Sequence, residues 1–65
     1  MDINFSKITK SILERLAISE AALAKLVGVK QPTIHRIKTG EIKMPRYKTA
    51  QKLIEIHDEG LEKAS

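Results

Sequence analysis

The chain has 65 residues, a length that limits it to one small domain. Twelve Lys and Arg residues stand against eight Asp and Glu residues, so the net charge is +4. Hydrophobic residues make up 42% of the chain and charged residues 31%, which is typical of a folded globular domain and not of a disordered one. The absence of cysteine excludes a disulfide framework, a Cys-ligated zinc site and a thiol nucleophile.

The sequence contains no candidate membrane span and no candidate signal peptide. Its apolar runs are much shorter than the roughly 20 residues that a membrane-spanning helix needs. Residues 1–4 lack the basic start and the apolar stretch of a secretory signal. We therefore expect a cytoplasmic protein that makes no membrane contact.

Basic residues are concentrated in one part of the chain. Residues 30–52 carry seven Lys and Arg residues and a single acidic residue, Glu41, for a local charge of +6, whereas the rest of the chain carries −2. A basic segment beside a mildly acidic remainder is typical of a domain that binds a polyanion, although solvated basic faces are also common. The acidic residues Asp58, Glu59 and Glu62 lie at the other end, where they are expected to face away from phosphate.

Two helices are predicted in the first half of the chain. The first covers residues 6–17, with Ser6 as its cap and an apolar stripe at helical spacing that is widened by Leu13 and otherwise consists of Phe5, Ile8, Ile12 and Leu16. The second covers residues 20–27, which are strong helix formers. Ser19 can cap this helix, and Gly28 suits a left-handed residue at its end.

Two further helices are predicted after a turn of about three residues. The third covers residues 32–38, with Gln31 as its cap and Pro32 in its first turn, Ile34 and Ile37 facing inward, and Thr39-Gly40 ending it. Residues 40–44 form a polar loop, and Pro45 precedes a fourth helix over residues 46–58, which Gly60 breaks before a frayed turn at 61–65. Its inward arc consists of Tyr47, Ala50, Leu53, Ile54 and His57, with Ile56 outside that arc. The fold class is therefore all-α with four main helices.

The second and third predicted helices form a helix-turn-helix pattern. Ile34 and Ile37 anchor the third helix, whereas Gln31, Pro32, Thr33, His35, Arg36 and Lys38 are left for an exposed polar face. A helix of this kind fits the major groove of B-DNA. An ordinary helical hairpin accounts equally well for the turn, but it does not account for the polar start of the third helix or for the basic excess.

At this point the chain resembles a known family. The segment from Ser19 to Glu41, SEAALAKLVGVKQPTIHRIKTGE, is similar without gaps to the helix-turn-helix of the phage Cro and lambdoid repressor family. The framework that carries the resemblance is Ala21, Leu23, Ala24, Gly28, Val29, Gln31, Ile34 and Gly40. Residues 43–47 also look like the segment that leads into that family's fourth helix, so the resemblance covers roughly residues 5–57. It implies a lambda-repressor-like fold of four to five helices and a sequence-specific regulator that binds double-stranded DNA.

The resemblance also implies which residues read bases. Gln31 matches the first reading position, where its amide can bond adenine N6 and N7; its alternative role is a helix cap. Pro32 matches the second position and can contact only an apolar group such as a thymine methyl. Arg36 matches a later position and can pair with guanine or, alternatively, with a phosphate. Thr33 lies beside them and can reach either a base or a phosphate.

The phosphate contacts implied in the same way lie around these residues. They are Ser19, Lys30, His35, Thr39, Lys43 and Arg46. Glu20 departs from the family, which often has a phosphate-contacting Gln there, since a carboxylate repels the DNA backbone and the contact is then lost or passed to Ser19. His35 and His57 are too few and too isolated for zinc, and we expect no metal or cofactor.

A single reading helix covers few base pairs, so we expect a weak homodimer that DNA strengthens and that spans a palindromic operator. The expected dimer surface is Ile54, Ile56 and Leu61. The short stretch after His57 favours a Cro-like protein over a larger repressor. No phosphate loop, metal-ligand spacing or paired carboxylate indicates an enzyme. The alternative is an antitoxin-type regulator or interaction module of the same fold that binds a protein partner.

Overall fold

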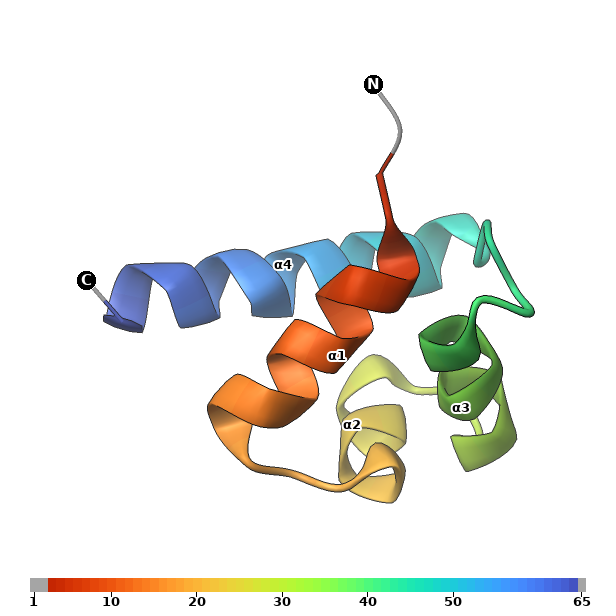
Figure 1. Cartoon of the computed structure of the whole chain (residues 1–65), viewed down its shortest axis with the longest axis horizontal. Helices are drawn as coiled ribbons and strands as arrows, with labels where there is room; N and C mark the ends of the chain where they lie inside the picture. Colours follow the sequence, from red (N-terminus) through yellow and green to blue (C-terminus); the bar gives the residue numbers. More distant parts are fainter. Residues whose placement is uncertain (1–2, 65) are drawn as a thin grey trace.

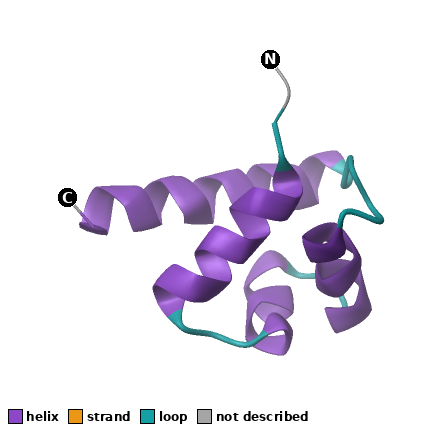
Figure 2. Ribbon diagram, viewed as in Figure 1, coloured by secondary structure: helices purple, strands orange, loops and turns teal. Residues whose placement is uncertain are grey.

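The computed structural model describes residues 3–64 of the chain, with side chains as far as Glu59. These residues form four helices and no strand: α1 (Phe5–Leu16), α2 (Glu20–Val27), α3 (Gln31–Thr39) and α4 (Tyr47–Ala64). Figures 1 and 2 show α1 crossing α4, with α2 and α3 on the same side of α4 as α1. The prediction of an all-α fold with four main helices is confirmed.

The first helix begins one residue earlier than predicted, because its cap is Asn4 and not Ser6. The Asn4 side-chain oxygen accepts a hydrogen bond from the Lys7 N–H at 3.1 Å, which satisfies one of the unpaired donors of the first turn. Ser6 instead lies inside α1 and donates its hydroxyl hydrogen to the carbonyl of Lys38. That bond joins the start of α1 to the end of α3.

The predicted apolar stripe of α1 is correct at Phe5 and Ile12, which are buried, and wrong at Leu16, which is 42% exposed. Thr9 takes the remaining inward position and is fully buried. Residues 5, 9 and 12 lie on one face of a helix, so the buried face stops one turn before α1 ends. Ala17 then closes the helix in the left-handed conformation, with φ at 52°.

The helix pair formed by α2 and α3 has the predicted turn. The Ser19 hydroxyl oxygen accepts from the Ala22 N–H at 3.2 Å, and Gly28 ends α2 with φ at 86°. The third helix starts at Gln31, so Gln31 is its first residue and not its cap; Lys30 is the cap and makes no side-chain capping bond. Pro32 biases its predecessor away from helical angles, but that bias does not prevent Gln31 from joining the first turn.

The fourth helix is longer than predicted, and its buried face differs from the predicted arc mainly in the first turn. It continues through Gly60 to Ala64, because one glycine inside a helix costs only about 1 kcal/mol. Tyr47 was predicted to point inward but is 79% exposed. Thr49 and Leu53 are buried, and Ile56 packs partly against the core. Ala50 and Ile54 also pack against the core, so the predicted arc is correct at Ala50, Leu53 and Ile54 and wrong at Tyr47.

All four helices contribute to a single core. Its buried side chains are Phe5 and Ile12 from α1, Leu23 and Ala24 from α2, Ile34 and Ile37 from α3, and Leu53 from α4. The first helix packs against both α3 and α4, and α2 packs mainly against α3. Within residues 3–64, no helix is long and apolar enough to cross a membrane. The core thus fixes α3 by its two isoleucines and leaves its other side free.

Candidate functional site

The third helix presents a polar face at the edge of the molecule. Ile34 and Ile37 are fully buried, whereas the side chains of Gln31, Pro32, His35, Arg36 and Thr39 are exposed and those of Thr33 and Lys38 are half-buried. In Figure 1, α3 lies at the periphery, next to the connection that leads to α4. Its exposed face is therefore accessible to a large partner, and the isoleucines hold it against the core.

The connection between α3 and α4 is held close to α3. The Ile42 N–H donates to the carbonyl of Arg36 at 3.1 Å, and Ile42 packs against the core. Gly40 ends α3 with φ at 90°, a backbone conformation that favours glycine. Lys43 and Arg46 are both exposed on this connection. Two cations are thus placed beside the C-terminal end of α3 by hydrogen bonding and packing.

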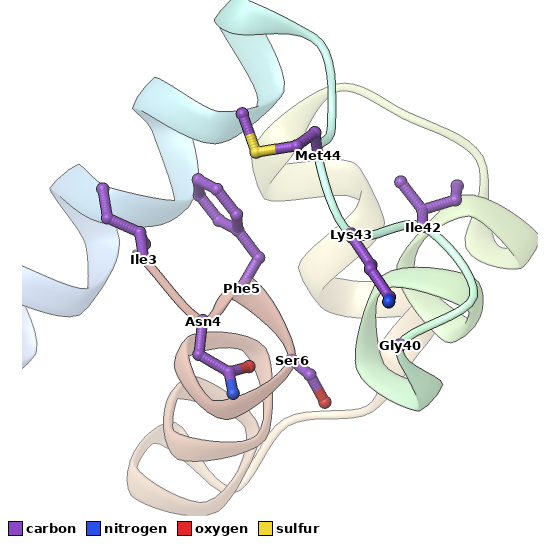
Figure 3. Close-up of a pocket in the computed structure, with 8 residues that line it drawn as sticks. All are labelled: Ile3, Asn4, Phe5, Ser6, Gly40, Ile42, Lys43 and Met44. Carbon is purple, nitrogen blue, oxygen red and sulfur yellow. The ribbon is translucent and has the colours of Figure 1, made fainter. Parts of the chain in front are cut away.

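An open groove of about 710 Å³ runs between this connection and the start of α1 (Figure 3). Apolar side chains of Ile3, Phe5, Ile42 and Met44 make up much of its lining. Lys43 is the predicted phosphate contact that lines it. The groove therefore adjoins the basic connection, while Gln31 and Pro32 are not part of its lining.

The carboxylate of Glu20 contacts two side chains of α3, the Lys38 ammonium group and the His35 imidazole. Lys38 Nζ donates to Glu20 Oε2 at 2.9 Å, and His35 Nδ1 lies 3.3 Å from both carboxylate oxygens. Hydrogen bonding from Lys38, and then from His35, lowers the pKa of Glu20, because both interactions favour the charged form. The first residue of α2 is thereby tied to the second half of α3. We call Glu20, His35 and Lys38 the clasp.

The clasp is the main feature that the sequence analysis missed. Glu20 was expected to repel phosphate, and no partner for it was predicted. Its partners lie 15 and 18 residues away in the chain, beyond the reach of any local pattern. The usable signal is the helix pair itself, because a tight turn brings the start of one helix against the side of the next.

Ion pairing divides the basic residues of the segment 30–52 into two groups. Arg36 lies 3.7 Å from Glu41, Lys38 contacts Glu20, and Lys52 lies 4.0 Å from Glu55. Among the side chains that the structure describes, the other four have no acidic partner within 4 Å: Lys30, Lys43, Arg46 and Lys48. Lys48, in the first turn of α4, was absent from the predicted phosphate contacts. These four cations are available to an external anion.

The predicted site residues fall into two regions. The first region is the α2–α3 pair. The residues proposed to read bases are on α3: Gln31, Pro32, Thr33 and Arg36. The residues proposed to contact phosphate lie on or beside the same pair: Ser19, Lys30, His35, Thr39, Lys43 and Arg46. Thr39 donates its hydroxyl hydrogen to the Arg36 carbonyl at 3.2 Å. The residues of the predicted dimer surface are on α4, where Ile54 and Ile56 pack partly against the core. The side chain of Leu61 lies outside the described part of the structure.

Comparison with known proteins gives one positive result. A family model described as helix-turn-helix matches residues 10–63, which is most of the chain and includes all of α2 and α3. No curated protein and no solved structure matches the chain. Within the described residues, no group of three or more His, Cys, Asp or Glu side chains is placed to hold a metal ion.

Proposed function

Because the chain belongs to the helix-turn-helix family, a family of DNA-binding regulators, we propose that it is a Cro-like phage or prophage repressor that recognises a palindromic operator. The observation that carries this proposal is the exposed polar face of α3, held to the core by Ile34 and Ile37. An α-helix fits the width of the B-DNA major groove. The four cations without acidic partners supply the charge that a phosphate backbone attracts.

Base reading is assigned to the start of α3. Gln31 is exposed in the first turn, and its amide can donate to adenine N7 and accept from the adenine N6 amino group. Pro32 offers only an apolar surface, which suits a thymine methyl. Arg36 carries a planar fork that fits guanine O6 and N7. Its pairing with Glu41 is long and exposed, so this contact is weak enough to exchange for a base. Thr33 is half-buried beside these residues and completes the set.

Phosphate contacts are assigned to the residues around the reading face. Lys30 precedes α3, and Lys43 and Arg46 follow it on the connection, so cations lie at both ends of the helix. Ser19 uses its oxygen as a cap acceptor and keeps its hydroxyl hydrogen for a phosphate. Thr39 is exposed on α3 and completes the set when its hydroxyl turns from the Arg36 carbonyl to a phosphate. His35 was predicted for the same set, but it faces the carboxylate of Glu20 and is left out of it. Such contacts fix the position of the protein on the duplex and add affinity without sequence preference.

Repression by a dimer follows from the size of the reading surface. One α3 spans few base pairs, whereas two copies related by a two-fold axis read half-sites about one DNA turn apart. The simplest mechanism of control is then occlusion, in which the bound dimer blocks polymerase. The proposed dimer surface is the C-terminal part of α4, where Ile54 is only partly buried.

Selection of bound sites from random duplex DNA tests the proposal. A palindromic consensus with an adenine in each half-site is expected, together with binding that weakens steeply as salt rises. In the same assay, Lys43→Ala should weaken binding to every sequence alike and reduce the slope of log affinity against log salt by about 0.9. Recovery of no consensus, or an affinity that salt does not change, would overturn the proposed function.

A further inference from the structure

Glu20 is the most enclosed of the acidic side chains that form ion pairs in the described structure. Its side chain is only 19% exposed, and it lies between Lys38 and His35 of α3. Glu41, by comparison, is 69% exposed and approaches Arg36 no closer than 3.7 Å. Close charge-assisted bonds that are partly shielded from solvent hold more firmly than exposed pairs. The clasp is therefore a lasting feature of the helix pair.

We propose that Glu20 limits the sequence-independent affinity of the protein for DNA, because its carboxylate binds Lys38 and keeps that side chain from binding the DNA backbone. The carboxylate takes the place that a phosphate would otherwise fill beside Lys38. This inference rests on the proposed function and deepens it, since it concerns the balance between phosphate contacts and base contacts at the same site.

The physical reason is the origin of non-specific affinity. A cation that binds a phosphate releases counterions from DNA, and the resulting gain in affinity is the same for every sequence. Lys38 already has an internal anion at 2.9 Å, so moving it to a phosphate exchanges one charge-assisted bond for another. The contribution of Lys38 to binding is therefore small for all duplexes. The clasp at the same time joins α3 to α2.

Glu20→Gln tests the inference, because glutamine keeps the size of the side chain and removes its charge. We expect about three- to tenfold tighter binding to operator and non-operator duplexes alike, and a salt slope steeper by about 0.9 as Lys38 gains a phosphate. The matched control is Glu55→Gln, which removes the same charge from a pair on α4 whose atoms are 4.0 Å apart. This control should leave the slope unchanged.

Lys38→Ala provides a second and independent arm. In the wild-type background it should leave the salt slope unchanged, whereas in the Glu20→Gln background it should abolish the gain in slope. A loss of about 0.9 in the wild-type background would overturn the inference, because Lys38 would then already contact phosphate. Equal behaviour of Glu20→Gln and Glu55→Gln would also overturn it. If Glu20→Gln does not fold, Lys38→Ala can still overturn the inference by lowering the slope in the wild-type background.

The two proposals fail in distinguishable ways. If the wild-type protein shows no salt-dependent binding to any duplex, the proposed function fails and the inference fails with it. If the wild-type protein binds an operator and Lys43→Ala reduces the slope, but Lys38→Ala reduces it equally, only the role of Glu20 is wrong.

Discussion

Gln31 is the side chain on which sequence choice is proposed to depend. Gln31 lies in the first turn of α3 and is exposed. Lys30, and not Gln31 as predicted, occupies the cap position of this helix. Its amide is therefore not needed to begin the helix. That removes the competing structural role and leaves the side chain available to a base edge.

Gln31→Ala is expected to weaken binding mainly at one operator position. A bidentate contact between glutamine and adenine discriminates by about 1–3 kcal/mol, so the preference for adenine over the other three bases should fall by roughly that amount. The measurement is the affinity for four duplexes that differ at this base pair. Lys43→Ala is the control, since it should lower all four affinities together. An equal loss on all four duplexes with Gln31→Ala would show that Gln31 does not read a base.

Single residues also show where sequence patterns succeed. Ser19 and Gly28 were predicted from local chemistry alone, because a hydroxyl cap and a left-handed glycine need only their immediate neighbours. The cap of α1 could not be chosen in the same way. Asn4 and Ser6 are both good capping residues. Asn4 is the cap, and Ser6 donates to the carbonyl of Lys38, 32 residues away in the chain. Thr9 is a further case, since a buried hydroxyl without a partner breaks the apolar pattern.

The helices show the same division between local and distant causes. Their number and approximate bounds were predictable, because periodicity and terminal residues are encoded within each segment. The face that α4 buries was predictable only in part. Ala50, Leu53 and Ile54 pack as predicted, but Tyr47 counts as apolar and Thr49 as polar, whereas the packing exposes the first and buries the second. The third helix was predicted correctly, but the clasp between α2 and α3 joins residues that no helical period relates.

The helix ends give a pair of opposite predictions for stability. Ala17 and Gly28 end α1 and α2 in the same left-handed conformation, which glycine adopts freely and alanine does not. Gly28→Ala should lower the free energy of unfolding by about 1 kcal/mol. Nothing lies within 4 Å of the added methyl group, so this cost comes from the backbone alone. Ala17→Gly should raise the free energy of unfolding by up to about 1 kcal/mol.

Chemical denaturation of both variants beside the wild type measures these changes. The matched design separates conformation from packing, because each substitution exchanges the same two residue types at the same kind of helix end. If Gly28→Ala left the denaturation midpoint unchanged, the left-handed conformation would not be the reason for glycine at that position.

The clasp predicts a pH dependence of the α2–α3 pair. The folded-state pKa of Glu20 is lowered by its bonds to Lys38 and His35, so folding favours the ionised carboxylate. This contribution to stability is fully present above the ordinary glutamate pKa of about 4.3. It is lost as the pH falls through the lower folded-state value. Wild-type protein should therefore lose more stability than Glu20→Gln between about pH 6 and pH 3.

Thermal unfolding of the two proteins across this pH range is the measurement. Their midpoints should differ most near pH 6 and converge as the pH falls, because a protonated Glu20 resembles glutamine. Glu55→Gln, which removes a carboxylate from an exposed pair 4.0 Å apart, is the control. A difference between wild type and Glu20→Gln that did not change with pH would mean that the ionised clasp adds no stability.

At the scale of the whole molecule, basic and acidic residues are concentrated at different ends. Lys30, Lys43 and Arg46 lie on or beside the α3 end, whereas the later part of α4 carries Asp58 and Glu59. An uneven charge distribution orients a protein during its approach to a polyanion. The basic end would meet DNA first, and α4 would remain available for a second copy of the chain.

The last prediction concerns that second copy. The extension of α4 to Ala64 gives six more helical residues than the predicted end at 58, which enlarges the surface available for pairing. Ile54 is half-buried on this helix, and so is Ile56, which packs against the core. Ile54→Asp should raise the dissociation constant of the dimer at least about tenfold, equivalent to about 1.4 kcal/mol, because a charge replaces an apolar contact. Sedimentation across a range of concentrations measures this change.

Operator length separates the loss of pairing from the loss of folding. Ile54→Asp should bind a full palindrome much more weakly than the wild type but should bind a single half-site equally well, because the residues proposed to read bases are on α3 and not on α4. Leu61→Asp offers a second variant if Ile54→Asp does not fold. Unchanged sedimentation of both variants would exclude this part of α4 as the dimer surface. If Ile54→Asp also binds a single half-site more weakly than the wild type, the substitution has disturbed α3.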